Sequence, residues 1–130
     1  MSASEQAKAA AEAAFARGAY PHLVNSRPTV DKASTLSAFA DALSFPDYFG
    51  HNLDALYDCL TDLSWLPPGE HVLIWPGSDA LRKAEPKTYL AIRSVLSDAQ
   101  RALGPSTGAG TGSWQLTVVL PDAGAASPRA

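Results

Sequence analysis

The most informative stretch of this chain is Pro46-Asp-Tyr-Phe-Gly-His-Asn-Leu-Asp-Ala-Leu-Tyr-Asp-Cys-Leu-Thr-Asp62. Its first proline restricts the backbone at the entry to a turn. After the turn, leucines recur at helical spacing, and Asp54, Asp58 and Asp62 recur every fourth residue. On a helix this spacing aligns three carboxylates along one side and places the leucines on another. The stretch therefore predicts an amphipathic helix that runs to about Leu63.

Charge is distributed unevenly along the chain. No lysine or arginine occurs from Ala33 to Leu81, and this window contains seven carboxylates: Asp41, Asp47, Asp54, Asp58, Asp62, Glu70 and Asp79. The window carries −7 within a whole-chain net charge of −3, so the remaining residues sum to +4. This balance argues against nucleic acid as a direct ligand, because phosphate neutralisation needs clustered Lys and Arg. A solvated acidic face and a binding face for a cationic partner both remain open from the charge pattern alone.

The row of acids is unfavourable for the helix itself. Asp54 lies in the first turn, where a negative charge complements the helix dipole. Asp58 and Asp62 lack this explanation, because Asp is a weak helix former and Asp62 lies near the negative end of the helix. Each like-charge pair four residues apart costs about 0.2–0.5 kcal/mol. No Lys or Arg nearby in the sequence offsets these costs, and a solvated face and a cationic partner both remain open.

The turn before the helix places aromatic residues beside the acids. Gly50 supplies a permissive backbone position, and Asn52 is a good N-cap residue. We expect Phe49 to pack across the helix N-terminus as a hydrophobic staple. Tyr48 and Tyr57 are better suited to remain exposed as contact residues, because tyrosine gives a large contact area at a low entropic cost.

The chain as a whole alternates strands with helices. Strands are predicted at 20–24, 71–75 and 114–120, and helices at 2–17, 33–43, 52–63, 78–83 and 86–103. This order predicts an α/β fold with a small three-stranded parallel sheet and about four helices, because parallel strands need crossover connections. The Ala-rich helix at 2–17, with an apolar face of alanines and Phe15, is an additional N-terminal element. We expect a helical extension at 1–19, a folded domain at 20–121 and a disordered tail at 122–130.

Composition indicates the compartment and the class of protein. A chain of 130 residues that is 46% hydrophobic is large enough for one folded domain. Its apolar runs are too short to span a bilayer, and the N-terminus lacks the apolar core of a secretory signal. The single cysteine, Cys59, excludes an internal disulfide and suits a reducing cytosol. These features predict a cytoplasmic protein that binds neither membrane nor nucleic acid.

An enzymatic function is poorly supported by the residues. The acidic row could bind a divalent metal, but such sites usually draw oxygen ligands from converging elements or a dedicated loop. Cys59 borders the leucines and is better explained as a small core residue than as a nucleophile. His22, His51 and His71 occur singly, without metal-ligand spacing. We therefore expect no enzyme activity, no metal and no cofactor.

Residues 46–61 resemble the signature stretch of the barstar family, named for the intracellular inhibitor of the secreted ribonuclease barnase. The segments Asn52-Leu-Asp-Ala-Leu56 and Asp58-Cys-Leu-Thr61 carry the resemblance, and an aromatic-aromatic-glycine turn precedes them at the same spacing. A weaker similarity in the order of elements extends over residues 20–120. The resemblance implies a barstar-like fold and a 1:1 complex. In that complex, carboxylates take the places of RNA phosphates in a ribonuclease active site.

The resemblance also implies individual contacts. Asp58 matches the acid that enters the active site, and Asp54 matches an acid that pairs with a nuclease arginine. Tyr48 matches the aromatic residue that packs on the catalytic histidine. Further contact positions correspond to Gly50, Asn52, Leu53, Thr61 and, on the last long helix, Asp98. Tyr57 and Asp62 complete the expected binding set, whereas Asp41, Asp47, Glu70 and Asp79 are expected to contribute long-range attraction only.

Several positions depart from the barstar pattern. Tyr57 stands where barstar has a tryptophan, Phe49 replaces its second tyrosine, and residues 62–63 replace a Gly-Trp pair. Only the first of its two cysteines is present. These departures imply a guanyl-specific secreted ribonuclease other than barnase, with Asp62 as the residue that adjusts partner choice. The alternative is a barstar-like module for another cationic protein, and in either case we expect a monomer in the free state.

Overall fold

The computed structural model describes residues 3–25, 28–47, 49–103 and 114–121. In chain order its elements are α1 (Ala3–Ala16), β1 (Tyr20–Leu23), α2 (Lys32–Leu43), α3 (Leu53–Asp62), β2 (Gly69–Ile74), α4 (Ser78–Ala84), α5 (Pro86–Leu103) and β3 (Trp114–Val119). The α/β fold, its three parallel strands and the N-terminal helix are confirmed. No predicted boundary differs from the observed one by more than two residues. The tail expected at 122–130 lies outside the described residues.

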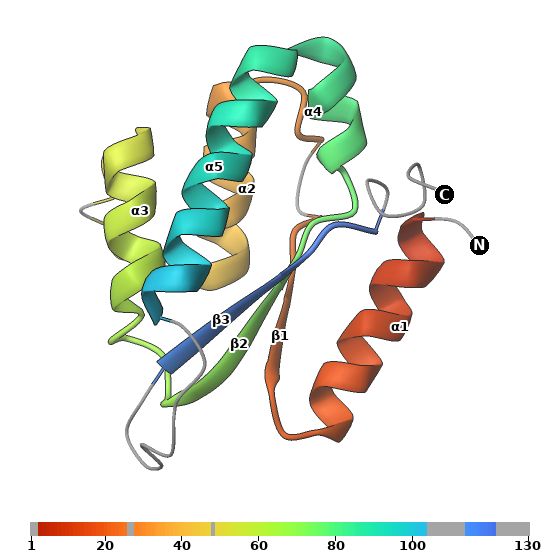
Figure 1. Ribbon diagram of the computed structural model, residues 1–130, viewed down its shortest axis with the longest axis vertical. Coiled ribbons are helices and arrows are strands. Elements are labelled where there is room, and N and C mark those ends of the chain that lie inside the picture. The colour runs from red at the N-terminus through yellow and green to blue at the C-terminus, as the bar shows by residue number, and fades with distance from the viewer. Residues whose placement is uncertain (1–2, 26–27, 48, 104–113, 122–130) are drawn as a thin grey trace.

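The sheet has the order β1-β2-β3, and both strand pairs are parallel. Figure 1 shows α2, α3 and α5 on one side of the sheet and α1 on the other. The central strand β2 is therefore covered on both faces, and residues 71–75 are all buried. A parallel strand in this position reads as a continuous apolar run rather than an alternating one.

The main core lies between the sheet and the four helices α2 to α5. Leu73 and Trp75 point into it from the central part of the sheet, and the Trp75 ring meets Phe39 of α2 edge-on, with ring centroids 5.0 Å apart. Helix α3 contributes Leu56, Cys59 and Leu60, and α5 contributes Ile92, Leu96 and Ala99. Because α3 also packs along α5, one long side of α3 is fixed by the core.

Helix α1 covers the opposite face of the sheet. Its buried residues Ala7 and Ala14 pack with Val72 and Ile74 of β2. Small alanine side chains allow the helix backbone to lie close to the strands. The prediction that Phe15 belongs to this apolar face is wrong, because its side chain is 78% exposed. One residue advances a helix by about 100°, which turns Phe15 away from the face that Ala14 occupies.

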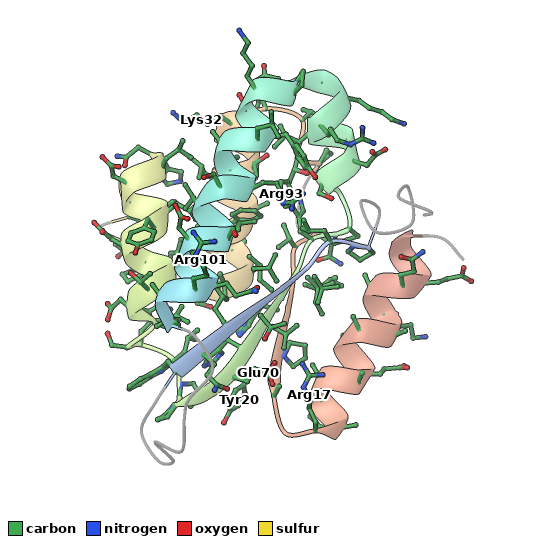
Figure 2. All side chains as sticks on the ribbon, in the orientation of Figure 1. Arg17, Tyr20, Lys32, Glu70, Arg93 and Arg101 are labelled. Atoms are coloured by element: carbon green, nitrogen blue, oxygen red, sulfur yellow. The ribbon has the colours of Figure 1, made fainter. Side chains whose placement is uncertain are left out.

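An ion pair ties the end of α1 to the sheet (Figure 2). Arg17 donates to both carboxylate oxygens of Glu70, from Nε at 3.1 Å and from Nη2 at 2.8 Å. Glu70 Oε2 also accepts from Thr117 Oγ1 of β3 at 2.7 Å. The hydrogen bonds from Arg17 lower the pKa of Glu70. Three elements that are distant in sequence therefore share one charged network.

The register of β1 and β2 brings two histidines together. His22 Nε2 lies 2.9 Å from His71 Nδ1, and His71 Nε2 lies 2.7 Å from the carbonyl oxygen of Pro67. The Tyr20 ring stacks on His71 at 4.9 Å between centroids. Because the Pro67 carbonyl oxygen can only accept, the proton of neutral His71 lies on Nε2, and His22 Nε2–H donates to His71 Nδ1. His22 Nδ1 lies 3.3 Å from the Ala42 carbonyl oxygen, and it donates there only when His22 is protonated. The interpretation of these two histidines as isolated is wrong, because the strand register brings them together.

The tight packing of α1 predicts a strong response to a larger side chain at position 14. Ala14 has no exposed surface, so Ala14→Leu should lower the free energy of unfolding by about 1–3 kcal/mol, the usual cost of overpacking. Ala13 is exposed on the same helix, and Ala13→Leu should stay within about 0.5 kcal/mol of the wild type. Urea unfolding followed by tryptophan fluorescence measures both values. Equal midpoints for the two variants would contradict the observed docking of α1.

The histidine pair predicts a loss of stability in mild acid. Burial lowers the pKa of His22, and the charge of His71 lowers it further; burial also lowers the pKa of His71. The folded protein therefore binds fewer protons than the unfolded chain, whose histidines titrate at about pH 6.5. The contribution to stability is complete above that pH and is lost as the pH falls through the lowered folded-state pKa values. We expect the urea midpoint to fall between about pH 7 and pH 5.

A matched pair of variants isolates this effect. His22→Gln keeps an N–H donor for His71 but does not titrate, so its midpoint should depend less on pH. His51 is exposed, and His51→Gln should retain the full dependence of the wild type. An unchanged pH dependence in His22→Gln would refute the role of the pair.

Candidate protein-binding site

The turn before α3 is organised by Asn52. Its backbone is extended (φ −137°, ψ 172°), and its Oδ1 accepts from the Ala55 backbone N–H at 2.8 Å, which confirms the predicted N-cap. Its Nδ2 donates back to the Gly50 carbonyl oxygen at 3.3 Å. The left-handed residue of this turn is His51 (φ 53°) and not Gly50. Gly50 instead allows close approach, since a Cβ there would lie 3.2 Å from Asn52 Nδ2.

The aromatic residues of the turn have different environments. Phe49 is 6% exposed and packs on Phe45, with ring centroids 4.8 Å apart. Phe45 in turn meets Trp65 edge-on at 5.9 Å. Phe49 is thus part of the core, with ring contacts to Phe45 and His51, and the hydrophobic staple across the start of α3 stays a prediction. Tyr48, which the sequence predicts as a contact residue, lies outside the described residues.

Helix α3 has two chemically distinct sides. The side that faces the core carries Leu56, Cys59 and Leu60. The side that faces solvent carries Asp54, Tyr57, Asp58 and Asp62, and the half-buried Leu53 and Thr61 lie between the two. The Tyr57 side chain is 37% exposed. Thr61 Oγ1 donates to the Tyr57 carbonyl oxygen at 2.9 Å, so this hydroxyl is bonded to its own helix.

The carboxylates of α3 are exposed and lack cationic partners within the described part of the chain. No Lys or Arg side chain there forms an ion pair with Asp54, Asp58 or Asp62. Asp62 Oδ2 accepts one hydrogen bond, from Ser64 Oγ at 3.2 Å. The row predicted from the sequence is therefore present as a continuous anionic surface.

This anionic surface also acts on the single thiol. Burial raises the pKa of Cys59, and the negative charges of Asp58 and Asp62 raise it further. A thiol held in its protonated form by these effects is a poor nucleophile. Cys59 is 3% exposed and packs with the leucines, as the sequence analysis expected of a core residue.

Two other acids of the charge window are neutralised locally. Glu70 pairs with Arg17, and Asp79 pairs with Arg82 and, at 3.2 Å, with Lys83. The expectation that both contribute long-range attraction is therefore wrong. Arg82 and Lys83 lie just beyond the cation-free window, and Arg17 reaches Glu70 only through the fold. This pairing leaves α3 as the more clearly anionic part of the window.

The structure places Asp98 on α5, the helix that packs along α3. Its side chain is half exposed and forms an ion pair with Arg101, three residues later. Asp98 thus differs from the acids of α3, because a cation of its own helix already occupies it. The sequence analysis did not identify Arg101 as part of this region, although the i,i+3 spacing would have indicated the pair.

A shallow recess borders the turn between α2 and α3. Its volume is about 360 Å³, and it is lined by Ser37, Ala40, Asp41, Phe45, Pro46, Asp47, Phe49 and His51. No sequence pattern indicates this recess, because its walls come from a helix and a loop whose relative placement depends on the core.

Other kinds of site were sought among the described residues. They contain no group of three or more His, Cys, Asp or Glu side chains placed to hold a metal ion. None of the helices within these ranges is long and apolar enough to cross a membrane.

A comparison with protein families decides the classification. The family model described as Barstar (barnase inhibitor) matches residues 21–116, which is more than half of the chain. The chain belongs to the Barstar family. The match begins after α1, so this helix lies outside the matched residues. The resemblance inferred from residues 46–61 is confirmed.

A curated relative from Bacillus subtilis (strain 168) shares a short, closely similar segment. The protein is named "Putative ribonuclease inhibitor YrdF", and it is 67% identical over 27 residues. These residues make up 21% of this chain and 30% of that protein. The matched segment therefore supports the Barstar assignment locally and covers less than a third of the relative.

The cap of α3 gives a direct prediction about stability. Asn52→Ala removes the oxygen that accepts from Ala55, and this should lower the free energy of unfolding by about 0.5–2 kcal/mol. Asn52→Ser keeps an acceptor oxygen and should stay close to the wild type. Urea unfolding followed by circular dichroism compares them. An alanine variant as stable as the serine variant would contradict the capping role.

Proposed function

We propose that this Barstar-family chain is a cytoplasmic inhibitor, and not an enzyme, that blocks a secreted guanyl-specific ribonuclease in a 1:1 complex. The observation that carries the proposal is the row of exposed carboxylates on α3, which lack cationic partners in the described residues. A ribonuclease active site presents cationic donors to RNA phosphates. Carboxylates in the same positions accept charge-assisted hydrogen bonds from those donors.

Rigidity of α3 supports the same mechanism. Its leucines are buried in the main core, and its first turn is capped by Asn52. An inhibitor whose carboxylates are already in place loses little conformational freedom on binding, so more of the interaction energy appears as affinity. The acids also attract a cationic partner before contact, which speeds association at low salt.

Individual roles follow from position and from the family. Asp58, in the middle of the exposed side, enters the active site, and Asp54 pairs with an arginine of the nuclease. Tyr57 supplies exposed aromatic area beside them. The complete proposed contact set is Tyr48, Gly50, Asn52, Leu53, Asp54, Tyr57, Asp58, Thr61, Asp62 and Asp98. Residues 20–121 form the inhibitory unit in this proposal, residues 1–19 are accessory, and the free protein is a monomer.

Asp62 is the proposed determinant of partner choice. It is the last residue of α3, where the negative end of the helix dipole disfavours a carboxylate. A cation on the partner would offset that cost, so a nuclease with an arginine or lysine near this end binds better than one without. The residue departs from the family pattern at the edge of the binding face, where partners differ more readily than at the centre.

The proposal predicts that Asp58→Asn abolishes most of the inhibition. The isosteric change removes the charge and leaves any nuclease cation facing it unpaired. Truncation of a buried, hydrogen-bonded charge pair costs about 2–5 kcal/mol in complexes that include barnase–barstar, so inhibition should weaken by about thirtyfold or more. An RNA-cleavage assay with a panel of small secreted guanyl-specific ribonucleases measures the inhibition constant.

Glu12→Gln is the matched control. It removes one negative charge from the exposed side of α1, across the sheet from α3, and should leave inhibition unchanged. If the wild type leaves every nuclease of the panel active, the inhibitor function is wrong and the alternative, another cationic protein, takes its place. If Asp58→Asn inhibits as well as Glu12→Gln, the binding mode through α3 is wrong.

A further inference from the structure

Arg101 is an exposed cation of α5, the helix that packs along α3. Figure 2 shows it on the part of α5 that runs beside α3. Its Nη2 donates to Asp98 Oδ1, and its Nη1 donates to Ser97 Oγ at 3.1 Å. The guanidinium is thus bonded at two points to its own helix. The Arg101 side chain is 70% exposed and that of Asp98 is 50% exposed.

This arrangement opposes the binding that the acids of α3 favour. Asp98 is the one member of the proposed contact set that has a cationic partner within the described residues. The positive charge of Arg101 offsets the negative charge of Asp98, so this carboxylate attracts a cationic surface less strongly. It also repels any partner cation that approaches Asp98. Because an ion pair this exposed is weak, a partner with a suitably placed cation is still able to displace it.

We propose that Arg101 is a specificity-determining residue of the ribonuclease-binding face. It masks Asp98 in the free protein and admits only a cationic partner that takes this carboxylate over while Arg101 turns into solvent. The inference rests on the proposed function. It adds a cation that repels a cationic partner to a surface whose carboxylates attract one. Specificity between similar partners commonly needs both.

The test compares two arginines that each pair with an aspartate three residues earlier, although Asp79, the partner of Arg82, is also paired with Lys83. Arg101→Gln and Arg82→Gln both remove one positive charge from an i,i+3 pair with an aspartate, but Arg82 lies on α4, a helix apart from α3. Association with the ribonuclease that the wild type inhibits is measured by stopped flow at low and high salt. We expect Arg101→Gln to associate about two- to fivefold faster at low salt than Arg82→Gln, with a smaller difference at high salt.

A double-mutant cycle separates masking from a general charge effect. If Arg101 acts through Asp98, the increase in association rate caused by Arg101→Gln should be smaller when Asp98→Asn is already present. Arg101→Lys keeps the charge and should bind like the wild type. Equal rates for Arg101→Gln and Arg82→Gln, or a gain that persists in full with Asp98→Asn, would overturn the inference. Circular dichroism and thermal midpoints verify that each variant is folded.

The two proposals fail in different ways. If the wild type inhibits no ribonuclease of the panel, the proposed function is lost, and poly-L-lysine becomes the cationic probe for the same variants. Tighter binding of poly-L-lysine by Arg101→Gln than by Arg82→Gln, lost with Asp98→Asn, then supports masking of Asp98. Indistinguishable binding by the two variants overturns it.

Discussion

The burial of β2 on both faces is the constraint on which this structure depends. The strand is hydrogen-bonded on both edges, so its side chains above and below the sheet must each find a cover. Leu73 on one face requires the layer of α2, α3 and α5, and Val72 and Ile74 on the other require α1. The position of α3 follows from the first requirement. The helix that carries the proposed binding face is held in place because its other side forms part of the core.

This double role explains how the fold tolerates a row of like charges. Each i,i+4 pair of acids costs about 0.2–0.5 kcal/mol, whereas each fully buried leucine contributes about 1.5–3 kcal/mol. Leu56 and Leu60 of α3 have no exposed surface. Burial on one side of the helix therefore exceeds repulsion on the other several-fold. Repulsion among the acids therefore lowers the free energy of unfolding only slightly. In the proposed complex, a cationic partner would relieve this repulsion.

The sequence predicted what local chemistry determines. Leucine spacing located α3, and the chemistry of Asn52 located its first residue. The Glu70–Arg17 pair joins residues 53 positions apart, and the His22–His71 contact depends on strand register, so neither has a local pattern. The prediction that Phe15 lies on the buried face of α1 was wrong for a different reason. In an alanine-rich helix, hydrophobicity does not indicate which side is buried. Of the candidate site, the alignment of the acids on one side of α3 was predictable from their spacing, and the Asp98–Arg101 pair also has a local i,i+3 pattern.

The separation of the two sheet faces bears on how such a protein diversifies. Helix α1 begins and ends before residues 21–116, which carry the family match, and it covers the face opposite to α3. Helix α1 packs against β1 and β2, with Val72 and Ile74 in the shared cluster, and none of these elements carries the acidic surface of α3. Sites that share no contacts contribute almost additively to free energy. Changes in α1 should therefore alter stability with little effect on the proposed binding face, and changes at Asp62 or Arg101, the proposed determinants of partner choice, should have little effect on the core.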